Sequence, residues 1–199
     1  GPSPLISFLH SILGTGTNTF AMDRSKIPKL RSFLTDEEWT QIEAFPTVLR
    51  LLYDRRLPRA LRANLHRLEA LEGLDATRVL DDQPFSLDAE ELWVALNLQL
   101  LHLVDFLPVA NWSAHQSDPS FVLFRDLYSL LEAAGQLRVC LAYTPATGPA
   151  RRVGERTGLA GWIATLVPAD VVERRAAQSV QRFSERCGHT LEGTLRWAD

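Results

Sequence analysis

The sequence predicts a mainly α, single-domain protein in which a bundle of about seven helices surrounds one buried central helix. Leucine dominates the apolar residues with 33 copies, and it favours helix over strand. Apolar residues recur at helical spacing along much of the chain. Residues 87–107 are apolar on nearly every face, which is typical of a helix inside a core. Together these observations predict the fold class.

Composition narrows the protein class without identifying a function. The 199 residues carry a net charge of −3, with 46% hydrophobic and 23% charged residues. Such proportions are typical of a soluble globular domain and exclude collagen, coiled-coil rods and disordered tails. Two cysteines are too few for a disulfide framework or a four-cysteine zinc site. We therefore expect no cofactor and an intracellular, reducing compartment, cytoplasm or nucleus.

The N-terminal residues predict a short apolar helix followed by a linker. Gly1-Pro2-Ser3 resembles the remnant of a cleaved affinity tag. Ser3 is a suitable N-cap and Pro4 suits the first helical turn. Gly14 ends the helix, and residues 14–19 are typical of a flexible linker. The apolar residues at helical spacing, which form the predicted partner-binding face, are Leu5, Phe8, Leu9, Ile12 and Leu13.

Met22 is the only methionine and suggests a boundary between residues 1–21 and a helical domain at 22–199. A short helix this apolar is unstable alone, so it must dock on other residues. Two interpretations stay open. The segment is either the first helix of the domain or a tethered ligand helix that lies in a groove.

The elements of the first half follow from caps, prolines and leucine spacing. Residues 28–34 form a short helix. Thr35 and Glu38 form a capping box for a helix that Pro46 is expected to end. Residues 47–53 form another helical stretch. Pro58 begins an amphipathic helix that ends at Gly73, with leucines along one face.

The second half is predicted by the same signals. Ser86 is expected to cap the central helix at 87–107, which Pro108 ends. Asn97, Gln99, His102 and Asp105 interrupt its apolar run, which disfavours a membrane span. Further helices are expected at 119–134, 159–166 and 169–186, with a loop at 144–157. The segments 137–143 and 190–197 are candidates for a small two-stranded element.

A stripe of basic residues along one predicted helix suggests a nucleic-acid-binding surface. On the predicted helix 58–73, the basic residues face away from the leucines, and such a stripe could contact phosphates. The negative net charge and the lack of interleaved aromatic residues favour a solvated helix face instead. The residues concerned are Arg55, Arg59, Arg62 and His66, with Arg151 and Arg152 further along.

The central helix carries the pair that an enzyme would use. His102 and Asp105 are i, i+3 neighbours, and a carboxylate that orients an imidazole is a known catalytic device. A buried, mutually satisfied polar pair explains them equally. No histidine or glutamate spacing completes a metal site. A thiolate pair between His189 and Cys140 or Cys187 is disfavoured by burial or by the end of a helix.

Residues 81–85, Asp-Asp-Gln-Pro-Phe, resemble the aspartate-rich motif of terpene cyclases, an all-helical family. That resemblance implies carboxylates that hold Mg²⁺ against a diphosphate. Pro84 disfavours a helical setting, and no second metal-binding motif follows. We therefore expect a loop before the Ser86 cap.

The sequence favours a non-catalytic protein-interaction module, an adaptor or scaffold that binds an amphipathic helix in an apolar groove. Its partner is a protein or a second copy of the chain. The first alternative is a nucleic-acid-binding domain that uses the arginine stripe. The second is a small helical enzyme that uses His102 and Asp105.

Overall fold

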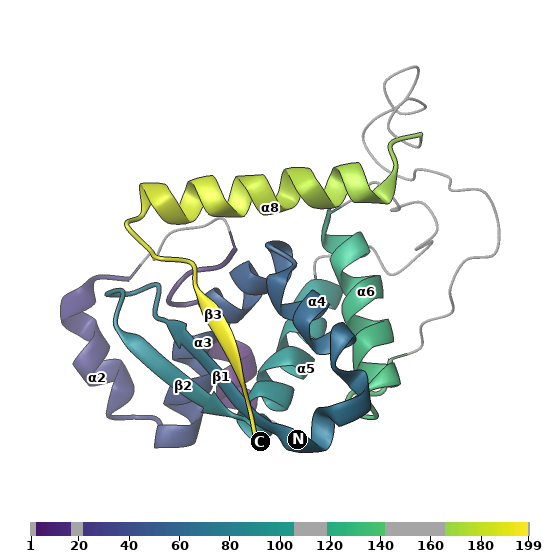
Figure 1. Cartoon of the computed structure of the whole chain (residues 1–199). Coiled ribbons are helices and arrows are strands. Elements are labelled where there is room, and N and C mark those ends of the chain that lie inside the picture. Colours follow the sequence, from purple (N-terminus) through teal and green to yellow (C-terminus); the bar gives the residue numbers. More distant parts are fainter. Residues whose placement is uncertain (1–2, 17–21, 106–118, 142–165, 199) are drawn as a thin grey trace.

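The computed structural model of the chain is mainly helical, as the sequence predicts, with a small antiparallel sheet (Figure 1). It describes residues 3–16, 22–105, 119–141 and 166–198, so the loop at 144–157 and nearly all of the helix at 159–166 lie outside the described residues. The elements are α1 (Pro4–Leu9), α2 (Ile27–Arg31), α3 (Asp36–Tyr53), α4 (Arg56–Ala63), β1 (Leu71–Thr77), β2 (Pro84–Asp88), α5 (Ala89–Asp105), α6 (Pro119–Ala133), α8 (Ala169–Arg186) and β3 (Gly193–Trp197), with 3₁₀ turns at Arg24–Lys26 and Leu65–Ala70.

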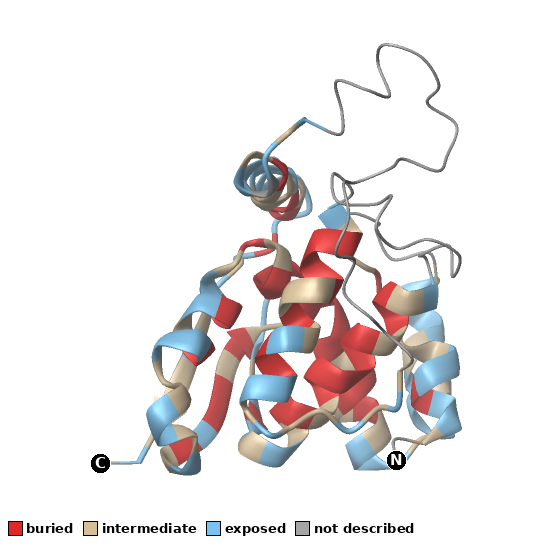
Figure 2. Ribbon diagram, turned by 90° about the vertical axis from the view of Figure 1, so that its right-hand side faces the viewer, coloured by how far each residue is buried: buried red, intermediate tan, exposed pale blue. Residues whose placement is uncertain are grey.

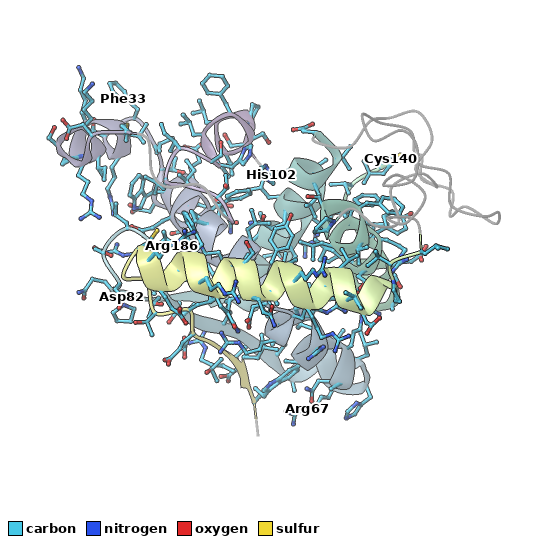
Figure 3. The ribbon with its side chains drawn as sticks, turned by 90° about the horizontal axis from the view of Figure 1, so that it is seen from above. Phe33, Arg67, Asp82, His102, Cys140 and Arg186 are labelled. Carbon is cyan, nitrogen blue, oxygen red and sulfur yellow. The ribbon has the colours of Figure 1, made fainter. Side chains whose placement is uncertain are left out.

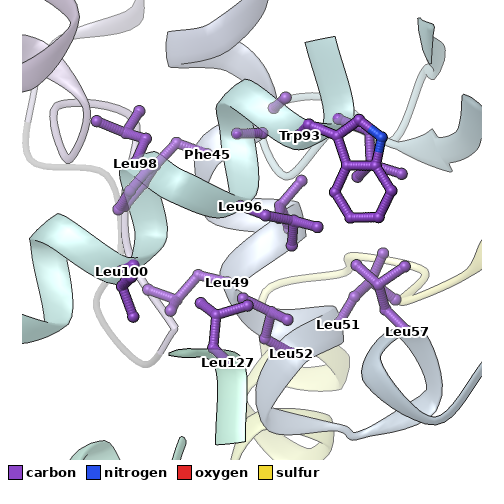
Figure 4. Close-up of a cluster of buried hydrophobic side chains, with 14 of the residues drawn as sticks. Phe45, Leu49, Leu51, Leu52, Leu57, Trp93, Leu96, Leu98, Leu100 and Leu127 are labelled. Carbon is purple, nitrogen blue, oxygen red and sulfur yellow. The ribbon is translucent and has the colours of Figure 1, made fainter. Parts of the chain in front are cut away.

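The core lies where α3, α5 and α6 meet, and buried residues gather there while exposed ones face outward (Figures 2 and 4). Phe45 and Leu49 of α3 pack with Leu96 and Leu100 of α5 and with Leu127 of α6, all of them buried. The helix predicted as central is thus buried, and α3 is buried along a similar length.

Helix α3 is longer than predicted because it runs through Pro46. The Thr35–Glu38 capping box forms as expected. Proline inside a helix costs roughly 3 kcal/mol, since it removes one hydrogen bond and crowds the preceding turn. Phe45 and Val48, on either side of Pro46, are both fully buried. Burial of this apolar run outweighs the penalty, so the predicted break at Pro46 is wrong.

The amphipathic helix predicted at 58–73 is wrong beyond its first half. Helix α4 ends at Ala63, a 3₁₀ turn follows, and Leu71 begins β1. Leu71 and Leu74 are both buried in β1, where the pairing with β3 has a register irregularity between Leu71 and Gly73. Helical periodicity therefore extended the predicted helix too far.

The sheet has three strands in the order β2-β1-β3, both pairs antiparallel, where two strands were expected. The strand predicted at 190–197 is confirmed as β3, but it pairs with β1 and not with 137–143. Residues 137–141 form no strand, and 142–143 lie outside the described residues. Gly73 permits the pairing, because a Cβ there would lie 2.0 Å from the carbonyl oxygen of Leu87.

The start of the central helix also needs correction. Helix α5 begins at Ala89, because residues 84–88 form β2 rather than a loop with a Ser86 cap. The Asp88 carboxylate accepts from the Glu91 amide at 2.8 Å, and the Glu91 carboxylate accepts from the Asp88 amide at 2.9 Å. This reciprocal box caps α5 two residues later than predicted. Residues 106–107 lie outside the described part.

The last two described helices match their predictions closely. Helices α6 and α8 span 119–133 and 169–186, against predictions of 119–134 and 169–186. Helix α8 lies across one end of the molecule and is seen end-on in Figure 2. Among the described residues, no helix combines the length and the apolar run that crossing a membrane requires.

Candidate functional site

The residues with the most distinctive setting are 3–16, which dock on α3 and α5 far along the chain. Ser3 caps α1 as predicted, accepting from the Leu5 amide at 3.3 Å. Helix α1 ends at Leu9, and shorter turns continue to Gly14. Residues 14–16 belong to this docked stretch, and the rest of the predicted linker lies outside the described residues.

The structure distributes the predicted apolar face unevenly. Leu13 is buried, while Leu9 and Ile12 are half-buried against the core. Leu5 is 44% exposed and Phe8 is 83% exposed. Ile6, which the spacing did not select, is buried instead. Because α1 ends at Leu9, one helical period does not extend to Leu13, and the anchors are Ile6 and Leu13.

Among the described residues, three side-chain contacts join this segment to the body of the protein. The Ser3 hydroxyl donates to the Glu38 carboxylate at 2.5 Å. The ring nitrogens His10 Nε2 and His102 Nδ1 lie 2.8 Å apart. The Arg50 guanidinium donates through Nε to the Thr15 carbonyl oxygen at 3.3 Å. The contacts join the start, middle and end of the segment to α3 and α5.

The histidine contact has a defined direction. His10 Nδ1 donates to the Ser7 carbonyl oxygen at 2.6 Å, so Nε2 of a neutral His10 ring is an acceptor. His102 Nδ1 must therefore carry the hydrogen that lies between the two rings. Phe45 packs edge-on against both rings, with centroids 4.6 Å from His10 and 5.0 Å from His102. We call these three residues the histidine joint.

Burial keeps His102 neutral. Loss of hydration, and secondarily the nearby His10, lower the pKa of His102 from 6.5 to about 4. Protonation above that pH would place a charge among apolar groups. Asp105 does not offset this, because it is exposed and no hydrogen bond or ion pair joins it to His102 in the described part of the chain, where His102 Nδ1 faces His10 instead. The predicted pairing of His102 with Asp105 is wrong.

A cavity of about 450 Å³ lies beside the joint and beneath α8. Figure 3 looks down on α8 and shows His102 at its flank. The docked segment supplies one wall through Thr15 and Gly16. The hydroxyl groups of Tyr53 and Ser120, both lining residues, lie 3.0 Å apart. The other described residues of the lining are Leu49, His102, Leu103, Pro119, Arg175, Ala176, Ser179 and Val180.

The predicted basic stripe does not form a uniform free surface. Arg55 is half-buried and pairs with Asp126 at 3.2 Å and with Glu173 at 2.5 Å. Arg62 donates to the backbone carbonyl oxygen of Asp126 at 2.6 Å. Of the predicted set, Arg59, Arg62 and His66 are exposed, and His66 lies in the 3₁₀ turn after α4. Arg151 and Arg152 lie outside the described residues.

A second polar centre surrounds Arg50, which the sequence analysis missed. Its side chain is fully buried. Nη1 donates to Ser184 Oγ and to His189 Nδ1, each at 3.2 Å, while Nη2 has no hydrogen-bond partner among the described residues. His189 Nε2 in turn donates to the Thr77 carbonyl oxygen at 3.0 Å. An arginine inside the run Val-Leu-Arg-Leu-Leu was the available signal.

This centre differs from the cysteine–histidine pair considered from the sequence. Burial, and more weakly the Arg50 charge, lower the pKa of His189. Its ring nitrogens already have partners in Arg50 and Thr77, and Cys140 and Cys187 are both exposed thiols. Within the described ranges, no three His, Cys, Asp or Glu side chains cluster as metal ligands would.

The carboxylates of the Asp-Asp-Gln-Pro-Phe stretch are also engaged in the fold. Asp81 pairs with Arg78 at 2.5 Å. Asp82 accepts from the amide and the hydroxyl of Thr190 at 2.7 and 2.8 Å, and these hydrogen bonds lower the pKa of Asp82. Asp82 therefore ties the start of the C-terminal segment to the turn before β2.

Comparisons of the chain with protein-family models, with curated proteins and with solved structures find no match. Any proposal for function therefore stands on the geometry described above.

Proposed function

We propose that the chain from Met22 onward is a helix-binding interaction module, and that residues 3–16 occupy its groove as a ligand segment. We define the groove as the surface that buries Ile6 and Leu13, beside α3, which α1 contacts, and α5, where His102 meets His10. The observation that carries this proposal is the manner of attachment. The segment adds two buried apolar anchors and three polar contacts to a core that α3, α5 and α6 already form.

The contacts of residues 3–16 are of a kind that can form and break without disrupting the rest of the fold. It contributes no strand to the sheet, whose three strands all lie between residues 71 and 197. Most of α1 faces solvent, including Phe8. Helix-in-groove recognition uses a few apolar anchors of this kind together with polar contacts at the edges. A second segment of similar chemistry, from a partner protein or another copy, would compete for the same anchors.

The experiment uses a variant that begins at Met22 and a fluorescent peptide of residues 3–16. We expect the variant to fold and to bind the peptide saturably in a polarisation assay. A Leu13→Asp peptide should fail to bind, because a charge would replace a buried anchor. A Phe8→Asp peptide is the matched control and should bind nearly as well as the original, because Phe8 faces solvent.

A second experiment tests the proposal if the variant that begins at Met22 does not fold. A protease site placed between residues 17 and 21 allows the intact, folded protein to be cut afterwards. The proposal expects the cut segment to exchange with labelled peptide while the remainder keeps its circular-dichroism spectrum. Unfolding on cutting, or a segment that never exchanges, would show that residues 3–16 are an ordinary first helix of the domain.

The geometry supports the two alternative functions less than the interaction module. The nucleic-acid proposal needs a continuous stripe of free arginines, and Arg55 is neutralised by Asp126 and Glu173, which leaves Arg59 and Arg62 exposed. The enzyme proposal needs Asp105 to orient His102, but Asp105 is exposed and His102 Nδ1 lies 2.8 Å from His10 Nε2. The interaction-module proposal is the one that accounts for the contacts of residues 3–16 with α3 and α5.

A further inference from the structure

We infer that the cavity beneath α8 is a binding site for a small carboxylate that carries an apolar body. This inference does not rest on the helix-binding proposal. Its volume, about 450 Å³, falls within the range of small-molecule sites. The helices α3, α5, α6 and α8 supply most of its walls, and Thr15 and Gly16 of the docked segment supply the rest of the described lining.

The charge of the lining selects the sign of the ligand. Arg175 is the charged member of the described lining, and no carboxylate belongs to that set. Within the described residues, Arg175 has no ion-pair partner. An exposed guanidinium at the wall of a pocket binds a planar carboxylate through two parallel hydrogen bonds.

A second guanidinium adds to the positive potential from behind one wall. Arg50 donates to the carbonyl oxygen of Thr15, and Thr15 lines the cavity. Its charge is fully buried without a carboxylate partner in the described residues, and its Nη2 makes no hydrogen bond. Charges in such a medium act over longer distances than in water. An anion in the cavity would offset this buried charge.

The rest of the lining selects an apolar body and a neutral polar contact. Leu49, Leu103 and Val180 supply aliphatic surface. His102, which also lines the cavity, has a pKa of about 4 and adds no positive charge near neutral pH. Arg175 is therefore the contact expected for the carboxylate, with the aliphatic side chains contacting the body of the ligand.

The test uses octanoate as the probe, with octan-1-ol as its uncharged counterpart, on the intact chain. Binding is followed by methyl NMR shifts of Leu49, Leu103 and Val180 and by calorimetry. We expect saturable octanoate binding that shifts these methyl groups, with octanol at least tenfold weaker. Equal binding of the alcohol, shifts elsewhere alone, or no octanoate binding would overturn the inference.

Neighbouring arginines on α8 provide a matched pair of variants. Arg175→Gln should weaken octanoate binding about tenfold, the value of one charge-assisted contact of about 1.4 kcal/mol. Arg174→Gln removes the same charge from the adjacent position, where Arg174 pairs with Asp170 at 2.9 Å and lies outside the cavity lining. It should bind as the original does. Equal affinity of the two variants would contradict the role of Arg175.

The octanoate assay and the peptide assay separate the two proposals. The octanoate assay keeps residues 3–16 in the chain, so its failure leaves the groove proposal standing. A peptide that does not bind the Met22 variant leaves the octanoate result unaffected.

Discussion

The two ends of the described chain are attached to the body in different ways. Residues 3–16 are held by two apolar anchors and by side-chain contacts, among them the histidine joint. The C-terminal strand β3 pairs along β1 through its backbone, and Trp197 packs against Arg67 with 4.6 Å between ring centroid and guanidinium carbon. Backbone pairing makes β3 part of the sheet, whereas the N-terminal attachment resembles binding.

Arg50 joins these two regions. Its Nε contacts the Thr15 carbonyl oxygen of the N-terminal segment, and its Nη1 contacts His189 at the start of the C-terminal segment. One buried side chain on α3 therefore supports both attachments. A shared contact does not make the two attachments equal, because β3 pairs with β1 through backbone hydrogen bonds that do not involve Arg50.

The largest expected effect comes from removing the C-terminal strand. Deleting residues 193–199 should abolish cooperative unfolding, since β1 would lose one of its two partner strands and the contacts of Leu195 and Trp197. Deleting residues 1–21 should leave a cooperative, though weaker, thermal transition. Melting curves followed by circular dichroism measure both. Equal losses from the two deletions would remove the distinction between the ends.

Arg50→Ala should have the next largest effect, a loss of about 3–5 kcal/mol of unfolding free energy. The substitution leaves a cavity, and it removes the hydrogen bonds that Arg50 donates to Thr15, Ser184 and His189. Arg186→Ala is the control, because Arg186 lies over the same Phe183 ring, at 5.6 Å, but is exposed. It should change stability by less than about 0.5 kcal/mol. Urea denaturation measures both, and a small loss for Arg50→Ala would reject its joining role.

Leu13→Ala should cost about 2–4 kcal/mol, because the side chain is 2% exposed and its truncation leaves a cavity at the anchor. Phe8→Ala should cost less than about 0.5 kcal/mol, because Phe8 is 83% exposed. The same denaturation experiment compares them. A larger loss of unfolding free energy for Phe8→Ala than for Leu13→Ala would contradict the observed burial and favour the helical face predicted from the sequence.

Acid should weaken the protein through His102. The folded-state pKa of about 4 lies below the unfolded value of 6.5, so between these pH values the unfolded chain binds more protons. Unfolding free energy should therefore fall as the pH falls, by roughly 2 kcal/mol from pH 7 to pH 5. The lowered pKa of His189 acts in the same direction. His102→Gln should show a shallower pH dependence, and an unchanged slope would contradict this assignment.

The sequence predicted those elements whose signals are local. Helix α8 carries an amphipathic period between Pro168 and Gly188, and its predicted bounds are confirmed. Strand β1 was missed because Leu71 continues the helical spacing of the preceding leucines, and its pairing with β3 joins residues more than 100 positions apart. No pattern in one sequence reports a pairing of that separation.

Sequence reasoning found only the local features of the candidate site. The apolar segment and its cap at Ser3 are local features, and both were recognised. The contact of His10 with His102 joins residues 92 positions apart, and the guanidinium of Arg50 meets His189 across 139 positions. Such meetings depend on how α3 and α5 pack, which single-sequence reasoning does not supply.

Amide hydrogen exchange on the intact chain tests the central difference most directly. The Ile12 and Gly14 amides donate to backbone carbonyls within the N-terminal segment, while amides of β1 donate within the sheet. If residues 3–16 bind as a ligand segment does, the first two amides should exchange through a local opening of clearly lower free energy than the β1 amides. Exchange of both sets at one common free energy would show that the segment is an integral part of the fold.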